Sequence, residues 1–139
     1  MLNPDNNTIT IASAMVLNFN GDLLVVRKKG SSYYMLPGGK IEAQETPAKA
    51  LVRELQEELQ FELPESAYHF LGTHRTAAAN ERGKSVCGYI FLLKERRANT
   101  PITPCAELEE VVWLTKENYK TYTLAHLLTE FALQRWLNG

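Results

Sequence analysis

Apolar runs typical of β-strands occupy the first part of the chain, and a pattern with the period of a helix follows them. Residues 9–19 and 23–28 are apolar and rich in β-branched types, and the Asn20-Gly21-Asp22 sequence between them is typical of a tight hairpin turn. Residues 33–36 form a shorter apolar run, and the Pro37-Gly38-Gly39 sequence after it predicts a loop. We therefore expect an N-terminal β-hairpin followed by a glycine-rich loop.

A helical period begins near residue 46. Leu51, Leu55 and Leu59 recur at the spacing that places side chains on one helical face. Thr46 suits the N-cap position, and Pro47 suits the first helical position, where its missing N–H has no intrahelical partner. This pattern predicts a helix over residues 46–59.

The second half of the chain repeats the order of strands followed by a helix. Residues 68–76 and 86–93 predict a second hairpin, residues 94–107 an exposed loop, and residues 111–114 another strand. Residues 124–137 carry an apolar stripe at helical spacing and predict a final helix. The order of these elements favours an α/β (α+β) fold, in which a mixed β-sheet has helices packed on its faces.

Composition adds limits on size and partners. The 139 residues are 45% hydrophobic and 22% charged, which is typical of a single folded domain, and we expect one domain over residues 1–139. The net charge of −1 provides no overall field that would attract nucleic acid or an anionic membrane. No apolar run approaches the roughly 20 residues that span a bilayer. We expect neither a nucleic acid nor a membrane as a partner.

The chain also lacks the sequence features of an exported protein. Its start, MLNPDNN, has no basic segment of the kind that opens a secretory signal. Cys87 and Cys105 form neither a CxxC pair nor a dense disulfide framework, so we interpret them as reduced thiols. Both features favour a cytoplasmic location.

Three glutamates on the first predicted helix form an acidic face. Glu54, Glu57 and Glu58 share an arc of about 100° on a helical wheel. Like charges at these spacings repel by a few tenths of a kcal/mol per pair. The apolar stripe lies on an adjoining arc, so core packing does not require the acids. Because clustered carboxylates suit a hard divalent cation, the pattern predicts a magnesium site, although a solvated surface helix is the alternative when the acids are taken alone.

Residues around the acidic face are suited to support such a site. Arg53 carries a guanidinium that can hold the carboxylate of Glu45 with two hydrogen bonds. Gly38 and Gly39 let the backbone approach closely, so that a main-chain oxygen can reach the ion.

The spacing of these residues resembles a known motif. Within GGKIEAQETPAKALVRELQEELQF, residues 38–61, the positions of Gly39, Glu45, Arg53-Glu54 and Glu57-Glu58 resemble the Nudix box of the Nudix (MutT-type) hydrolases. The box runs from residue 39 to residue 61, and the resemblance implies a Nudix-type α/β/α sandwich.

One position of the box departs from the family pattern. Gln60 stands where the family usually has a glycine, and that glycine resembles a helix C-cap in the left-handed region. A non-glycine residue held there costs about 1 kcal/mol, so the departure concerns local stability and loop shape.

The resemblance also implies roles for individual residues. It implies that Mg²⁺ or Mn²⁺ is bound by Glu54, Glu57, Glu58 and the carbonyl of Gly39. It implies that Glu45 and Arg53 pair to set the geometry of the site, with Gly38 in support and Arg53 counted among the catalytic residues. Glu107, just before the strand that contains Trp113, is an expected further ligand or general base, although a solvated loop acid is an equally good interpretation. The base is left open among Glu54, Glu57 and Glu107.

The implied reaction is metal-dependent hydrolysis of a nucleoside diphosphate linked to a group X. Secondary signatures of the subclasses that act on ADP-ribose, dinucleoside polyphosphates, NADH and coenzyme A are missing. Elimination favours a nucleoside triphosphate pyrophosphohydrolase that yields the monophosphate and pyrophosphate. A non-catalytic nucleotide sensor, a hydrolase of ADP-ribose or a nucleotide sugar, and an isoprenoid diphosphate isomerase stay open. A homodimer is expected from the resemblance alone.

Four residues outside the acidic face are candidates for substrate contacts. Arg27 and Lys28 end a strand near the glycine-rich loop, and Lys40 follows that loop, so all three can receive phosphates. Solvated charges at a strand end fit them equally well. Tyr34 can stack on a base, although aromatic residues in strands more often belong to the core.

Overall fold

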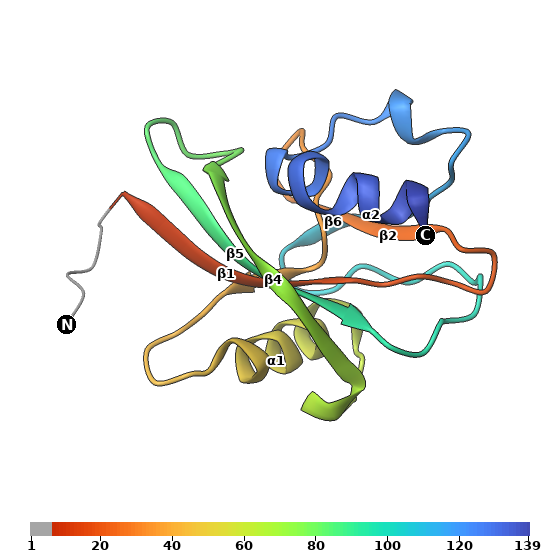
Figure 1. Ribbon diagram of the computed structural model, residues 1–139, viewed down its shortest axis with the longest axis horizontal. Helices are drawn as coiled ribbons and strands as arrows, with labels where there is room; N and C mark the ends of the chain where they lie inside the picture. The colour runs from red at the N-terminus through yellow and green to blue at the C-terminus, as the bar shows by residue number, and fades with distance from the viewer. Residues whose placement is uncertain (1–6) are drawn as a thin grey trace.

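The computed structural model describes residues 7–139 as a mixed α+β fold with two sheets and helices on both sides (Figure 1). The larger sheet has the strand order β3-β1-β5-β4. Its strands are β1 (Thr8–Met15), β3 (Gly38–Lys40), β4 (Tyr68–Ala77) and β5 (Ser85–Leu93). The smaller sheet pairs β2 (Leu23–Lys28) with β6 (Leu108–Leu114). Because β1 runs antiparallel to β3 and parallel to β5, the larger sheet is mixed, as the sequence predicts.

Helical segments cover the sheets from opposite sides. The segments are α1 (Pro47–Leu59), the π-helical turn η3 (Leu128–Ala132), α2 (Leu133–Asn138) and the 3₁₀ turns η1 (Glu65–Ala67) and η2 (Tyr119–Thr121). Figure 1 shows α1 on one side of the strands and α2 on the other. The final helix is therefore present, but it starts at residue 126 and contains a π turn that its apolar stripe did not indicate.

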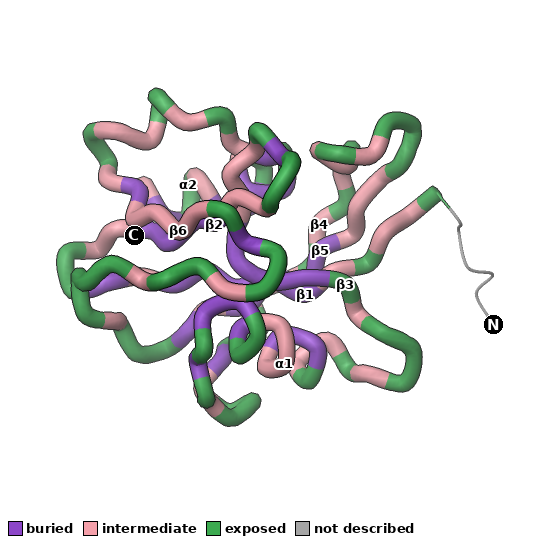
Figure 2. Tube along the Cα trace, turned by 180° about the vertical axis from the view of Figure 1, so that it is seen from behind, coloured by how far each residue is buried: buried purple, intermediate pink, exposed green. Residues whose placement is uncertain are grey.

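The second half of the central strand β1, residues 12–15, is buried on both of its faces and separates two cores. Ala12 and Ala14 belong to the core that contains Leu55 of α1. Met15 belongs to the second core, which contains Trp136 of α2. Figure 2 shows this buried strand between the two layers. Alternation of side chains along one strand thus builds the three layers that the family resemblance implies.

The predicted N-terminal hairpin is wrong in its pairing. The turn exists, since the Asn18 N–H donates to the Asp22 carbonyl at 3.1 Å and Leu17 bridges to Leu23. Beyond the turn the two strands separate, because β1 pairs with β3 and β5 whereas β2 pairs with β6. Apolar alternation shows that a strand has a buried face but does not specify its partner, and the partners here are distant in sequence.

The predicted glycine-rich loop is also partly wrong, because Gly38–Lys40 forms β3 beside β1. A Cβ atom on Gly38 would overlap with the Ala12 carbonyl oxygen and crowd Ser13. Gly38 also has a φ of +147°, which other residues rarely adopt. The glycine therefore permits a close strand contact here instead of a flexible loop.

The remaining elements agree with the sequence more closely. β4 and β5 form the predicted hairpin, with Ala77 opposite Ser85. The segment between β5 and β6 contains no helix or strand longer than an isolated bridge, and β6 starts at Leu108 instead of Val111. In residues 7–139 no helix has the length and apolar character that crossing a bilayer requires. The expectation about the N-terminal signal concerns mainly residues 1–6, which lie outside the described part.

Both ends of α1 form as the sequence predicts. The Thr46 hydroxyl accepts a hydrogen bond from the Lys49 N–H at 3.2 Å, and Pro47 is the first helical residue. Gln60 caps the other end with φ 59° and ψ 33°, in the left-handed region that the family fills with glycine. The Gln60 side chain is exposed, so the free-energy cost of this conformation comes from the backbone of the cap and not from core packing.

Gln60→Gly should therefore stabilise the protein. We expect the free energy of unfolding to rise by about 1 kcal/mol, because glycine adopts the left-handed conformation without strain. Gln56→Gly, at an exposed position inside α1, should lower it by about 1 kcal/mol. Urea unfolding followed by circular dichroism measures both changes, and a loss of stability in Gln60→Gly would contradict the strain at this cap.

Candidate active site

Arg53 is the centre of the polar network on the acidic face of α1. Its Nε atom donates to Oε2 of Glu45 at 2.7 Å, and its Nη2 atom donates to Oε1 of Glu45 at 2.8 Å. The same guanidinium reaches Glu54 at 2.9 Å, Glu57 at 3.3 Å and the Lys40 carbonyl at 3.1 Å. One planar cation thus ties the helix to the end of β3 and to the loop that follows it.

Glu54 lies directly against the backbone of β3. A Cβ atom on Gly39 would overlap with the carboxyl group of Glu54, so the contact requires glycine. The carboxylate is held from its other side by Arg53, and only 16% of the Glu54 side chain is exposed. Glu54 is therefore fixed between the helix and the strand.

Glu58 is the most deeply buried acid on this face. It is 2% exposed, and its Oε1 atom accepts a hydrogen bond from the Gly38 N–H at 3.2 Å. Burial raises the pKa of Glu58 to about 8; nearby Lys28 opposes this shift, whereas the carboxylates of Glu54 and Glu107 add to it. Such a carboxylate is stabilised in its charged form when a cation lies beside it.

The acidic face offers oxygen donors, which are what a hard divalent ion requires. In residues 7–139 no three carboxylate, imidazole or thiol groups converge as a ready-made metal site. Glu54 and Glu57 are hydrogen-bonded to Arg53, and Glu58 to Gly38. The available donors are nevertheless all oxygens, and one is a buried carboxylate with a raised pKa. This chemistry fits a hard cation such as Mg²⁺ or Mn²⁺.

Glu107 lies in the loop that leads into β6, close to these acids. Its carbonyl accepts a hydrogen bond from the Lys29 N–H at 2.9 Å, which places the loop beside the end of β2. Its carboxylate is near enough to raise the pKa of Glu58. Glu107 itself is exposed, so water can reach it.

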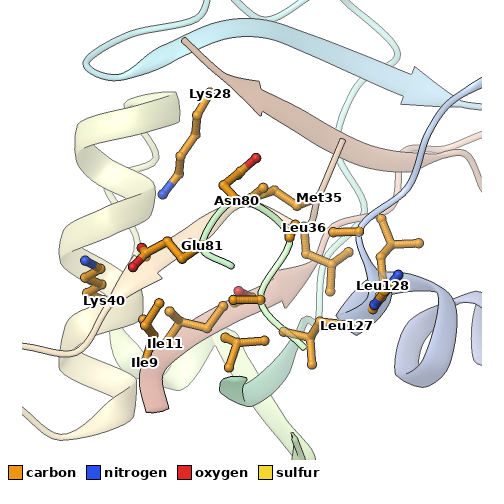
Figure 3. A pocket seen from close by; sticks show the side chains of 18 of the residues that line it. Ile9, Ile11, Lys28, Met35, Leu36, Lys40, Asn80, Glu81, Leu127 and Leu128 are labelled. Carbon is orange, nitrogen blue, oxygen red and sulfur yellow. The ribbon is translucent and has the colours of Figure 1, made fainter. Parts of the chain in front are cut away.

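A cavity of about 140 Å³ adjoins the acids. Gly38 and Gly39, which contact Glu58 and Glu54, also line the cavity. Figure 3 shows the cavity between β1 and the start of the C-terminal helix. The lining is mainly aliphatic and includes Ile9, Ile11, Met35, Leu36, Leu127 and Leu128. Lys28 and Lys40, two predicted phosphate contacts, also line it. The volume is below the roughly 300 Å³ typical of small ligand sites, so it has room for part of a nucleotide.

Arg27 and Tyr34 lie elsewhere and do not line this cavity. The Nε atom of Arg27 donates to Oε1 of Glu110 at 2.7 Å, and the Tyr34 hydroxyl donates to the same oxygen at 2.7 Å. These two bonds, with Tyr34 the larger cause, lower the pKa of Glu110. Arg27 also donates to the Ser31 carbonyl at 2.9 Å. The pair thus holds the loop after β2, and direct contact with a substrate stays a prediction.

Sequence analysis missed four polar residues that line the cavity, namely Ser13, Asn80, Glu81 and His126. Asn80 and Glu81 belong to the polar turn between β4 and β5, whose sequence resembles many solvated turns. His126 shows no metal-binding spacing along the chain. The pairing of β5 with β1 brings the β4–β5 turn to the cavity, and the hydrogen bond from the Ala125 N–H to the Tyr34 carbonyl at 2.9 Å brings His126 there. Both contacts join distant segments, so local sequence carried no signal for these residues.

The pairing of Glu45 with Arg53 predicts a pH-dependent stability. Hydrogen bonds from Arg53, and then from the backbone of Glu42, lower the pKa of Glu45 from 4.5 to about 2. The stabilisation is therefore present above pH 4.5 and is lost as the pH falls through about 2. We expect Glu45→Gln to lower the thermal midpoint at pH 6 and the deficit to shrink toward pH 3.

The matched control is Glu42→Gln, because Glu42 meets the same guanidinium at 3.5 Å and is exposed. It should change the midpoint much less at every pH. A deficit in Glu45→Gln that stays constant from pH 6 to pH 3 would contradict the assignment of the shift to this pair.

Part of this chain is similar in sequence to a curated protein. The "8-oxo-dGTP diphosphatase" of Escherichia coli (strain K12) is 40% identical over 55 residues, which is 37% of this chain and 43% of that protein. The chain therefore aligns with less than half the length of this curated relative.

Solved structures share the fold at lower identity. The MutT protein of Methanosarcina mazei Go1 has a TM-score of 0.76 at 20% identity, over 98% of this chain and 97% of that one. A bifunctional NMN adenylyltransferase/ADP ribose pyrophosphatase of Francisella tularensis, complexed with AMP and a manganese ion, has a TM-score of 0.69 at 21% identity, over 96% of this chain and 43% of that one.

The family model agrees with the motif and with the fold. The model described as the NUDIX domain matches residues 8–132, which include the acidic helix, β3 and both sheets. Because this model matches most of its length, the chain belongs to the NUDIX domain family.

Proposed function

We propose that this chain is a divalent-metal-dependent pyrophosphohydrolase that cleaves a nucleoside triphosphate, ribo or deoxy, into the monophosphate and pyrophosphate. The observation that carries the proposal is the buried Glu58 carboxylate, which lies against Gly38 where the acidic face meets the cavity. A site of this kind combines a place for a cation with a place for the non-phosphate part of a nucleotide. Residues 1–139 would act as one domain with a small-molecule substrate.

The metal would be held by oxygen donors of α1 and β3. These donors are Glu54, Glu57, Glu58 and the Gly39 carbonyl, with Glu107 as a further ligand. A bound divalent ion neutralises charge on the phosphoryl oxygens and makes a bound water more acidic. Arg53 positions Glu54 and Glu57 by its hydrogen bonds, and Glu45 orients Arg53 in turn.

Lysines beside the cavity would bind the phosphates. Lys28 and Lys40 both line it, and Lys40 directly follows Gly39, so they can attract the triphosphate to the acidic face. The aliphatic walls would take up the base and exclude water from it. The relative that acts as an 8-oxo-dGTP diphosphatase supports a purine nucleotide, and an oxidised one, among the substrates to be tried first.

The attacking water must lose its proton to a carboxylate near the acidic face. Glu54, Glu57 and Glu107 are the candidates. Glu107 is exposed and lies near Glu58, whereas Glu54 is held between Arg53 and Gly39. Geometry thus favours Glu107 or Glu57 for proton transfer and Glu54 for a fixed ligand role.

A substrate panel tests the proposal directly. Nucleoside triphosphates, 8-oxo-dGTP, ADP-ribose, dinucleoside polyphosphates and nucleotide sugars are incubated with Mg²⁺, and the products are resolved by chromatography. We expect monophosphate and pyrophosphate from a triphosphate. Binding without any turnover would support a nucleotide sensor and contradict the hydrolase.

Glu57→Gln should remove most of the activity without unfolding the protein. We expect kcat to fall by at least about 10²-fold, because the change removes a metal ligand on an exposed part of α1. Glu62→Gln, an exposed change just beyond the helix, is the matched control and should retain the wild-type rate. A wild-type rate in Glu57→Gln would overturn the role of the acidic face.

Metal binding provides a readout that is separate from activity. Titration calorimetry with Mg²⁺ and Mn²⁺, in the presence of a non-hydrolysable nucleotide, should detect uptake by the wild type. Glu58→Gln should weaken this uptake, because an uncharged amide then replaces the buried carboxylate at every pH. If the wild type takes up neither ion in any condition, the proposed metal-dependent hydrolase is contradicted and only the similarity of fold stands.

A further inference from the structure

Two loops that are distant in sequence meet at the rim of the cavity. The Ser31 hydroxyl, in the loop between β2 and β3, donates to Oδ1 of Asn80, in the turn between β4 and β5, at 2.9 Å. Ser31 is 8% exposed, whereas Asn80 is exposed and lines the cavity. Figure 3 shows Asn80 beside Met35, across the cavity from Ile9 and Ile11 in this view. A buried hydroxyl thus holds an amide at the entrance.

The direction of the hydrogen bonds fixes which way this amide points. The Tyr33 N–H donates to Oγ of Ser31 at 3.0 Å, which leaves the hydroxyl proton of Ser31 for Oδ1 of Asn80. The Ser31 backbone is itself held, because Arg27 donates to its carbonyl at 2.9 Å. The amide oxygen of Asn80 is therefore occupied, and its NH₂ group is what Asn80 offers to a ligand. Within residues 7–139 that nitrogen has no hydrogen-bond partner.

Other side chains of the lining offer less to the edge of a base. Most are aliphatic, and Glu81 is paired with Lys84 at 3.3 Å. The other polar residues of the lining, Ser13 and His126, have no side-chain hydrogen bond to residues 7–139 that would fix the direction of a donor, whereas Asn80 has one. Figure 3 shows Lys28 and Lys40 on the side of the cavity nearest the ribbon of α1, and the proposed function assigns them to the phosphates. A fixed donor in a mostly apolar cavity distinguishes ligands strongly, because a ligand without a matching acceptor leaves it unpaired.

We propose that Asn80 determines base specificity by donating its amide hydrogens to a carbonyl oxygen of the base, and that Ser31 positions it. The inference rests on the proposed function for the site that it deepens. Guanine, 8-oxoguanine, uracil and thymine carry a carbonyl where adenine and cytosine carry an amino group. A donor at that edge accepts the first group of bases and opposes the N–H donors of the second. The site therefore prefers keto-base nucleotides.

The test compares matched nucleotides in three variants. The pairs are dGTP with dATP and dUTP with dCTP, and the measured quantity is the ratio of kcat/KM within each pair. We expect the wild type to favour the keto member. Asn80→Asp, which replaces the NH₂ donor with a carboxylate oxygen, should lower kcat/KM for the keto members by about 10- to 100-fold and spare the amino members.

Ser31→Ala tests the positioning role. Without the hydroxyl the amide can rotate and present either its oxygen or its nitrogen, so the ratio should move toward one while kcat for the amino members is unchanged. Arg82→Ala, an exposed change on the same turn, is the control and should leave every ratio at its wild-type value. A parallel loss for all nucleotides in Asn80→Asp, or an unchanged ratio in both variants, would overturn the inference.

Binding separates this inference from the hydrolase proposal. Affinities of GMP, AMP, UMP and CMP are measured by nuclear magnetic resonance titration in EDTA, where no turnover occurs. A keto preference that disappears in Asn80→Asp supports the role of Asn80 even if the chain hydrolyses nothing. Equal affinity for all four, or no binding of any, contradicts it even if triphosphates are hydrolysed.

Discussion

The site depends on the close contact between the backbone of β3 and the acidic face of α1. Gly38 donates its N–H to Glu58, and Gly39 leaves the space that the Glu54 carboxylate fills. Any larger residue at position 39 would displace that carboxylate. Since Arg53 holds the same carboxylate from the other side, the position of the acids is set by backbone geometry and one guanidinium together.

Burial of the Glu58 carboxylate in this contact lowers the stability of the fold, which indicates that the carboxylate has a functional role. A carboxylate that is 2% exposed and has a pKa raised to about 8 opposes folding in its charged form. The protein offsets the cost elsewhere through two apolar cores, one on each face of β1. A buried charged group with a shifted pKa, surrounded by well-packed layers, is typical of residues that bind a ligand or take part in chemistry.

The cavity beside the acids is assembled from segments that are far apart in the chain. β1 and β3 form its floor, the β4–β5 turn its rim, and residues 125–128 its wall. The parallel pairing of β1 with β5 brings the β4–β5 turn to β1, and the hydrogen bond from the Ala125 N–H to the Tyr34 carbonyl holds the wall in place. The hydrogen bond between Ser31 and Asn80 joins two of the loops. Loops at the rim of a cavity can change in sequence with little effect on the packed layers that position the acids.

The sequence alone determined the helix, its caps and the acids on it, because those features depend on residues within a few positions of each other. Thr46, Pro47 and the left-handed Gln60 all follow from local backbone chemistry. Tertiary structure decided that residues 9–19 and 23–28 enter different sheets, that Gly38–Lys40 is a strand, and that Asn80 reaches the cavity. Strand partners and cavity walls come from contacts between distant segments, and alternation along one segment does not encode which distant segment it will meet.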